Sequence, residues 1–239
     1  MLEVAGLTKS FRGLRAAQDV SFAVPQASII GLIGPNGAGK TTCFNMIAGV
    51  FRPDAGEVRF AGARIDGWRA DRVCAAGIGR TFQIVKPFAG LSVLDNVVVG
   101  ALLREKAVSA AKSYAAEIVE KLGLSPKRDQ LASSLTLPDR KRLEVARALA
   151  TRPKLLLLDE VMAGLRPTEC DQIIAVFREL NRAEGLTILL IEHVMRAVMA
   201  LAQGIVVLHH GEVIARGAPH EVVRDPAVLE SYLGEETEV

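Results

Sequence analysis

The stretch GPNGAGKTT, at residues 34–42, decides the fold of this chain. It follows an apolar run, Ser28–Ile33, whose length and β-branched content predict a short buried strand, and the residues after it predict a helix. The nine residues hold three glycines, one lysine and two threonines in the spacing Gly-x-x-x-x-Gly-Lys-Thr. A strand, a glycine-rich loop and a helix in this order predict an α/β fold whose loop binds phosphate.

Each residue type in this loop has a physical role. Glycines allow the backbone N–H groups to turn inward without a Cβ in the way, and these donors favour a polyphosphate at the start of the helix. Lys40 can reach the β- and γ-phosphates, and the hydroxyl of Thr41 suits Mg²⁺. An ordinary glycine-rich turn is the alternative, but such turns seldom carry Lys-Thr in this context. The residues predicted to contact the nucleotide here are Gly34, Pro35, Asn36, Gly37, Ala38, Gly39, Lys40, Thr41 and Thr42.

The composition sets further bounds. The 239 residues, 50% hydrophobic and 23% charged, suit one large α/β domain or a core with a sub-domain. A net charge of +2 is close to neutral, so the composition gives no sign of the basic surface that binds nucleic acid. The three cysteines form no CxxC pair, so we expect buried reduced thiols. The N-terminus lacks the layout of a signal peptide and no long uninterrupted apolar segment occurs, which predicts a cytosolic chain.

Along the chain, strand-like runs come first, the middle is rich in helix formers, and buried strands return after Pro153. The predicted strands include 2–7, 20–24, 28–33 and 57–60, and the predicted helices include 107–122, 139–150 and 168–182. The helix at 139–150, DRKRLEVARALA, is expected to carry its basic residues on one face. We therefore predict a nucleotide-binding core with a β sub-domain from residues 1–83 and 153–239, and a helical sub-domain from residues 84–152.

Two acids close the apolar run LLLLDE at residues 155–160. A carboxylate at the end of a buried parallel strand lies beside the phosphate loop in P-loop enzymes, where Asp159 would orient Mg²⁺. Glu160 points differently and could polarise the attacking water. The alternative is a pair of strand-end acids that caps the next helix, but the upstream phosphate loop favours the catalytic interpretation.

Three further residues gain meaning from the order of the motifs. His193 ends the strand-like run TILLIEH, where it can reach the γ-phosphate and hold a water, although a strand-end histidine by itself is more often structural. Gln83 ends the run GIGRTFQ, where its amide can touch Mg²⁺ or water, although a single glutamine carries little information. Phe11 can stack on adenine, and core packing is its alternative.

The full order of motifs resembles the ATP-binding subunit of ABC transporters, from Leu2 to about Gly234. Within that family, GIGRTFQIVKPFAGLSVLDNVVVGAL and ARGAPHEVVRDPAVLESYL are similar to an ATPase subunit of branched-chain amino-acid importers. Amide or urea importers and a lipopolysaccharide exporter have similar subunits. A soluble ABC-type ATPase acting on nucleic acid or ribosomes is a rival, although such proteins usually carry two cassettes or a long coiled-coil insertion. A regulatory subunit that binds nucleotide but does not hydrolyse it is a further rival interpretation.

The resemblance implies an α/β P-loop NTPase core of the RecA type, with an antiparallel β sub-domain and a helical insertion. It implies two ATP molecules at the seam of a head-to-tail dimer. By this resemblance Phe11 stacks on adenine, Glu160 is the catalytic base, His193 is the switch histidine, and Lys40 is a third catalytic residue. The Mg²⁺ ligands implied in the same way are Thr41, Gln83 and Asp159.

The implied partners are integral-membrane permease subunits, a second related ATPase or a second copy of this chain, and indirectly an external solute-binding protein. Nucleic acid is not among them. The implied location is the cytoplasmic face of the inner membrane. The segment Ile84–Leu94 is unusually apolar for a surface loop, so it either seats a permease helix or packs inside the helical sub-domain.

Two positions depart from the family pattern. The signature usually reads Leu-Ser-Gly-Gly-Gln, whereas the matching stretch Leu135–Asp139 reads LTLPD. Pro138 has no N–H to offer a phosphate, although it suits the first turn of a helix. Arg166 replaces an aspartate that helps the two subunits sense each other. Both changes affect the partner's site more than this chain's own, which predicts an asymmetric heterodimer.

Overall fold

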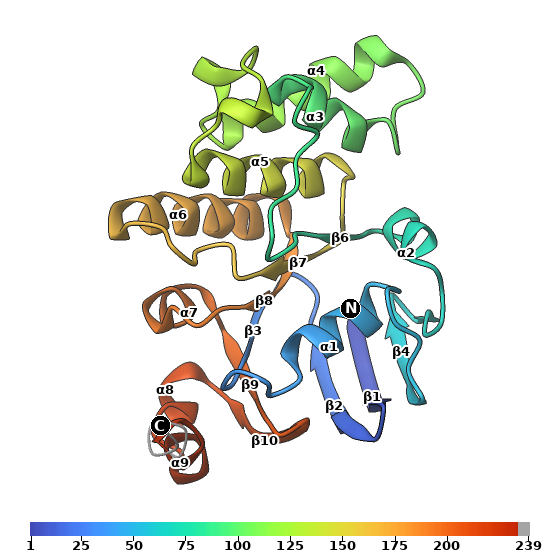
Figure 1. Ribbon diagram of the computed structural model, residues 1–239, viewed down its shortest axis with the longest axis vertical. Coiled ribbons are helices and arrows are strands. Elements are labelled where there is room, and N and C mark those ends of the chain that lie inside the picture. Colours follow the sequence, from blue (N-terminus) through green and yellow to red (C-terminus); the bar gives the residue numbers. More distant parts are fainter. Residues whose placement is uncertain (234–239) are drawn as a thin grey trace.

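The computed structural model describes residues 1–233 and is built around two β-sheets (Figure 1). The strands are β1 (Leu2–Phe11), β2 (Leu14–Val24), β3 (Ile29–Ile33), β4 (Ala55–Phe60), β5 (Ala63–Arg64), β6 (Ile78–Arg80), β7 (Leu155–Asp159), β8 (Thr187–Ile191), β9 (Gly204–His209) and β10 (Glu212–Gly217). The helices are α1 (Lys40–Ile47), α2 (Ala70–Ala76), α3 (Val93–Ala101), α4 (Val108–Lys121), α5 (Leu137–Ala150), α6 (Pro167–Glu184), α7 (Met195–Leu201), α8 (Pro219–Val222) and α9 (Pro226–Leu233), with 3₁₀ turns η1 (Ser125–Lys127) and η2 (Ala132–Ser134).

The larger sheet has the order β10-β9-β3-β8-β7-β6 and is parallel except for the β9–β10 pair. Every residue of β3, β7 and β8 is buried, as expected for parallel strands covered on both faces. Because successive side chains alternate between faces, Leu156 and Leu158 pack with α5 and α6, whereas Leu155 and Leu157 pack with α1 and the smaller sheet. The all-apolar run before Asp159 thus fills two cores at once.

The smaller sheet is antiparallel, in the order β2-β1-β4-β5. Its first two strands form a hairpin that turns at Arg12 and Gly13, both with positive φ. The sequence predicted strands at 2–7 and 20–24, and the mixture of polar and apolar residues between Val4 and Val24 indicated antiparallel strands with a solvated face, but no strand bounds were given for residues 8–11 and 14–19. The missed residues are mostly half-exposed and polar, so they lack the hydrophobic signal on which the prediction relied.

The middle of the chain is helical, as predicted. Helices α3, α4 and α5 lie together at one end of the molecule (Figure 1), and their buried side chains belong to the same hydrophobic core as those of α6. The predicted helices at 107–122, 139–150 and 168–182 correspond to α4, α5 and α6. The division into separate sub-domains at residues 84 and 152 stays a prediction.

The basic residues of α5 do not share one face, so that prediction was wrong. Arg140 donates to the carbonyl of Ser133, Lys141 to that of Glu160, and Arg142 contacts Gln172 on α6. Consecutive residues of a helix are about 100° apart, so three neighbours point three ways.

Two further expectations concern the cysteines and the membrane. Cys43, Cys74 and Cys170 are free thiols, and only Cys74 is not fully buried. Within residues 1–233, no helix is both long enough and apolar enough to span a bilayer. The sequence of the tail, DPAVLESYLGEETEV, predicts a helix that ends in an acidic stretch, and that acidic stretch lies outside the described residues.

Candidate active site

The phosphate loop connects β3 to α1 and requires its glycines. A Cβ on Gly34 would lie 2.0 Å from the Leu208 carbonyl oxygen, and one on Gly39 would lie 2.2 Å from the Ala16 oxygen. Both residues have positive φ, 146° and 99°. The ammonium of Lys40 donates to the carbonyls of Gly34 and Pro35, each at 2.6 Å. The sequence thus folds into a tight turn that brings the lysine back over its own loop.

Asp159 ends β7 as a buried carboxylate that is only partly satisfied. Its Oδ2 accepts a hydrogen bond from Arg80 Nη2 at 3.1 Å, and its backbone N–H donates to the Thr81 hydroxyl. Its Oδ1 is buried and has no hydrogen-bond partner among the described residues. Burial raises the pKa of Asp159, and the nearby Arg80 opposes that shift.

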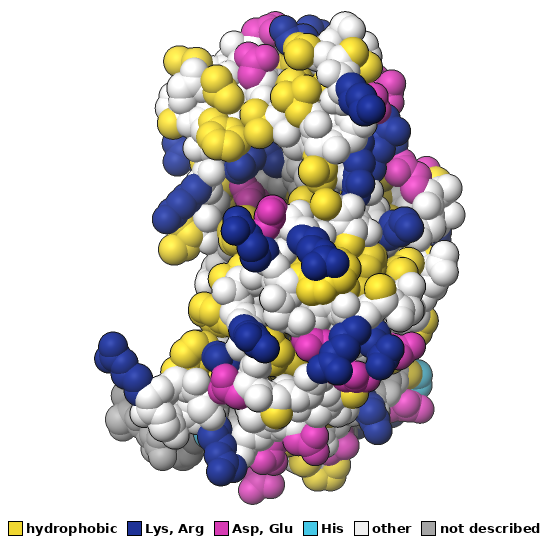
Figure 2. Space-filling model, turned by 90° about the vertical axis from the view of Figure 1, so that its right-hand side faces the viewer, with side chains coloured by type: hydrophobic (Ala, Val, Ile, Leu, Met, Phe, Trp, Pro, Cys, Tyr) yellow, Lys and Arg dark blue, Asp and Glu magenta, His cyan; other side chains and the backbone are white. Residues whose placement is uncertain are grey.

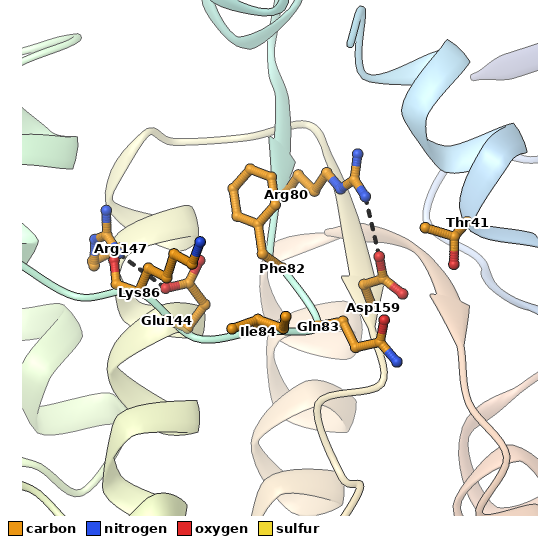
Figure 3. A pocket seen from close by; sticks show the side chains of 9 residues that line it. All are labelled: Thr41, Arg80, Phe82, Gln83, Ile84, Lys86, Glu144, Arg147 and Asp159. Carbon is orange, nitrogen blue, oxygen red and sulfur yellow. Dashed lines mark hydrogen bonds and ion pairs between the residues drawn. The ribbon is translucent and has the colours of Figure 1, made fainter. Parts of the chain in front are cut away.

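All three predicted metal ligands line one cavity of about 490 Å³ (Figure 3). Thr41 enters it from α1, Asp159 from β7, and Gln83 from the segment after β6. The other lining residues are Arg80, Phe82, Ile84, Lys86, Glu144 and Arg147. The fold therefore gathers hydroxyl, amide and carboxylate groups from three segments that are far apart in sequence.

Glu160 follows in an unusual backbone conformation. Its φ of 50° lies in the left-handed region, which costs a non-glycine residue roughly 1–2 kcal/mol. Its carboxylate accepts a hydrogen bond from Gln83 Nε2 at 2.8 Å. The exposed ring of His193 has its Nδ1 at 4.0 Å from the same oxygen. The structure thus brings together the three residues that the sequence proposed for handling water, with Gln83 directed at Glu160.

Phe11 is at the end of β1 with its ring 38% exposed. The ring meets Phe51 edge-on, with the centroids 5.2 Å apart, and Lys9 approaches it at 5.6 Å. Since the side chain is not buried, core packing does not account for it.

The sequence reasoning missed three charged residues that surround this site. Arg80 connects Asp159 to Asn45 on α1, to which it donates at 2.7 Å. Glu192 is 2% exposed, and it accepts the backbone N–H of Met162 at 2.7 Å. Lys141 is 7% exposed and donates to the Glu160 carbonyl at 2.8 Å. Two of these residues could have been noticed in the sequence, because Arg80 is a charged residue inside a buried strand segment and Glu192 is a charged residue at the end of another buried strand.

The departures from the family pattern have local partners. Thr136 occupies the N-cap position of α5, and its hydroxyl donates to the Asp139 side chain at Oδ2, 2.6 Å away, rather than accepting from the helix backbone. Lys127 contacts the same oxygen. Leu137 is half-exposed. Arg166 precedes α6 and pairs with Glu169 at 2.7 Å, while its side chain stays 81% exposed.

Comparison with known proteins agrees with this geometry. Residues 17–163 match the ABC transporter family, and residues 212–238 match a family described as branched-chain amino acid ATP-binding cassette transporter. The chain is 37% identical to the high-affinity branched-chain amino acid transport ATP-binding protein BraF of Pseudomonas aeruginosa, over 98% of both chains. It is 35% identical to the lipopolysaccharide export system ATP-binding protein LptB of Acidithiobacillus ferridurans, over 100% of this chain and 99% of that one. The ADP conformation of MJ1267, an ATP-binding cassette of an ABC transporter, superposes with a TM-score of 0.88 at 31% identity, over 98% of each chain.

The chain belongs to the ABC transporter family. It is an ATP-binding cassette with a P-loop fold, and its activity is ATP hydrolysis coupled to transport.

Proposed function

We propose that this chain hydrolyses Mg²⁺-ATP to drive uptake of branched-chain or other hydrophobic amino acids through separate permease subunits. The observation that carries the proposed chemistry is the cluster of Gln83, Glu160 and His193 next to Asp159. The solute class is supported by the match of residues 212–238 and by the likeness to BraF. The same C-terminal match favours import over lipopolysaccharide export, although LptB is nearly as similar over the whole chain.

The residues present fit a magnesium ion. The buried, unpartnered Oδ1 of Asp159 is an acceptor that a cation would satisfy, and the Thr41 hydroxyl and the Gln83 amide line the same cavity. Oxygen ligands of this kind are those that Mg²⁺ prefers. We propose Thr41, Gln83 and Asp159 as the residues that hold it. When bound, the ion neutralises charge on the β- and γ-phosphate oxygens.

The chain's own residues then supply binding and proton handling. The loop at residues 34–42 offers its N–H groups to the phosphates, and the Lys40 ammonium exchanges the carbonyls of Gly34 and Pro35 for phosphate oxygens. Glu160 accepts a proton from the attacking water, which Gln83 and His193 hold in place. The exposed part of the Phe11 ring stacks on adenine. Positioning and charge stabilisation supply most of the rate in phosphoryl transfer.

We propose a membrane partner for the apolar surface beside this site. Ile84, Phe88 and Leu91 are exposed, at 71%, 44% and 38%. Figure 2 shows further hydrophobic side chains, interspersed with polar and charged ones, on one face of the molecule. We propose that a cytoplasmic helix of a permease subunit covers Ile84, Phe88 and Leu91, and this chain would then lie at the cytoplasmic face of the inner membrane. An external solute-binding protein would then act on the same transporter without touching this chain.

We also propose that the second ATPase of the transporter is a different, related chain. Pro138 lies in the first turn of α5, where it offers no N–H, and Arg166, just before α6, pairs with Glu169 in the first turn of that helix. Both leave this chain's own loop, Asp159, Glu160 and His193 intact. ATP turnover of the reconstituted pair would be measured with Glu160→Gln here and with the equivalent change in the partner. Equal losses would refute the asymmetry and support a homodimer-like arrangement.

The transport proposal is tested by purifying the chain with the subunits that accompany it and reconstituting them in vesicles. ATP-dependent accumulation of labelled leucine is expected, and Glu160→Gln should abolish it. The matched control is Glu179→Gln, because Glu179 is an exposed acid on α6 away from the site. Normal ATPase activity without accumulation of any branched-chain amino acid would refute the solute class alone. ATPase stimulated only by nucleic acid would favour the soluble rival.

A further inference from the structure

Lys141 is a buried cation that reaches from α5 to the backbone of the neighbouring acid. It is 7% exposed, and its Nζ donates to the Glu160 carbonyl at 2.8 Å. A lysine is seldom buried to this extent unless its ammonium is satisfied. Burial lowers the pKa of Lys141, so keeping a charge here is unfavourable and the contact with the loop offsets that. Such a costly arrangement points to a role for the contact.

The residue that Lys141 contacts is held in a strained conformation. Glu160 has a φ of 50°, and its N–H donates to the Ile191 carbonyl at 2.9 Å. The Glu160 carbonyl accepts from Lys141 at 2.8 Å and, at the longer distance of 3.3 Å, from the Ala163 N–H, so both backbone polar groups of Glu160 are fixed. The rotamers open to a side chain depend on its backbone, so these bonds limit where the carboxylate points, and the Lys141 bond is the shorter of the two at the carbonyl.

A second buried charge holds the same loop two residues later. Glu192, at 2% exposure, accepts the Met162 N–H at 2.7 Å from the end of β8. Lys141 and Glu192 also attract each other. The loop after β7 is therefore held from two sides by side chains of opposite charge, one on α5 and one beside His193.

We propose that Lys141 is a positioning residue for Glu160. By holding the Glu160 carbonyl it keeps the carboxylate facing Gln83 and His193. This inference rests on the proposed role of Glu160 as the base. Since α5 starts at the altered stretch Leu135–Asp139, the contact also ties the start of that helix to the catalytic loop.

The test compares Lys141→Met, Lys141→Gln and Lys141→Arg in the full chain purified with its accompanying subunits. For Met and Gln, we expect kcat to fall about tenfold or more, as for a lost hydrogen bond to a charged group, with KM for ATP nearly unchanged. Arginine keeps a charged donor and should restore most of the turnover. The control is Arg142→Met, which removes one charge from the next position of α5 without touching Glu160. It should leave kcat unchanged.

A double-mutant cycle with Glu160→Gln separates positioning from support of the fold. If Lys141 acts through Glu160, adding Lys141→Met to Glu160→Gln should cause little further loss in single-turnover rate. Additive losses, an equal fall in nucleotide affinity, or no rescue by arginine would each overturn the inference. If Lys141→Met does not fold, Lys141→Gln takes its place in the double-mutant cycle and Lys141→Arg still tests rescue of the turnover. Undiminished turnover by Glu160→Gln would instead refute the proposed role of Glu160, and the inference with it.

Discussion

The ion pair between Arg80 and Asp159 allows a quantitative test of how the site is held together. The side chains are 8% and 1% exposed, and Arg80 also bonds to Asn45. Removing one partner of a buried pair costs about 3–5 kcal/mol, because a charge is left buried without a counterion. Two features reduce this cost here. Water can enter the cavity of about 490 Å³ beside the pair, and Arg80 Nε is itself buried without a partner among the described residues. Loss of that unsatisfied N–H returns about 1 kcal/mol.

We therefore expect Arg80→Met to lower the free energy of unfolding by about 2–3 kcal/mol at neutral pH. For a chain of this size, that corresponds to a fall in Tm of roughly 5–10 °C. The measurement is thermal and urea unfolding of the nucleotide-free protein with the metal chelated, which isolates the pair from Mg²⁺.

The loss should depend on pH in a defined direction. The pKa of Asp159 is raised in the folded protein by burial, and without Arg80 it rises further. When the pKa of a carboxyl is higher in the folded than in the unfolded protein, the fold loses stability as pH rises from the unfolded pKa through the folded one. The loss of unfolding free energy caused by Arg80→Met should therefore grow as pH rises from acid to neutral. The double variant Arg80→Met/Asp159→Asn, which carries no unpaired charge, should recover at least half of the loss. A deficit that does not depend on pH, or no recovery, would refute the account.

Three further predictions concern the loop, the acid and the core. Gly39→Ala should abolish binding of a fluorescent ATP analogue, because its Cβ would lie 2.2 Å from a backbone oxygen. Gly37→Ala should still bind the analogue measurably, because a Cβ there would have no other atom within 4 Å. Equal binding by the two variants would contradict the loop geometry. Glu160→Gln should retain nucleotide binding in equilibrium titration while single-turnover hydrolysis falls by about a hundredfold or more; loss of affinity instead would argue for a binding role. Phe177→Ala, at a fully buried ring, should cost about 3–5 kcal/mol of unfolding free energy in urea, and Leu14→Ala, at a side chain 73% exposed, should cost less than about 0.5 kcal/mol.

The sequence predicted those features whose signals are local. The phosphate loop is a contiguous run with a strand before it and a helix behind it, and LLLLDE combines a buried strand with its acids. The antiparallel character of Val4–Val24 was predicted, but residues 8–11 and 14–19 of the β-hairpin were given no strand bounds, because their exposed faces carry no hydrophobic pattern. The contacts of Arg80 were out of reach for a different reason. Its partner Asp159 is 79 residues away, and nothing in one sequence indicates that these two charges meet.

The structure also changes how the altered stretch Leu135–Asp139 should be understood. Replacing two glycines looks at first like a simple loss of phosphate donors. In the fold, however, Thr136 and Lys127 both bind the Asp139 carboxylate, and Pro138 lies in the first turn, where its fixed φ favours a helix. The start of α5 is thus firmly anchored. Lys141 is the fifth residue of the same helix and donates to the Glu160 carbonyl. If the proposed roles of Lys141 and Glu160 hold, a rigid start to α5 would support this chain's own site while offering fewer donors to a partner's. In the proposed heterodimer, the same substitutions at Leu135–Asp139 would thus weaken the partner's ATP site and support this chain's own site.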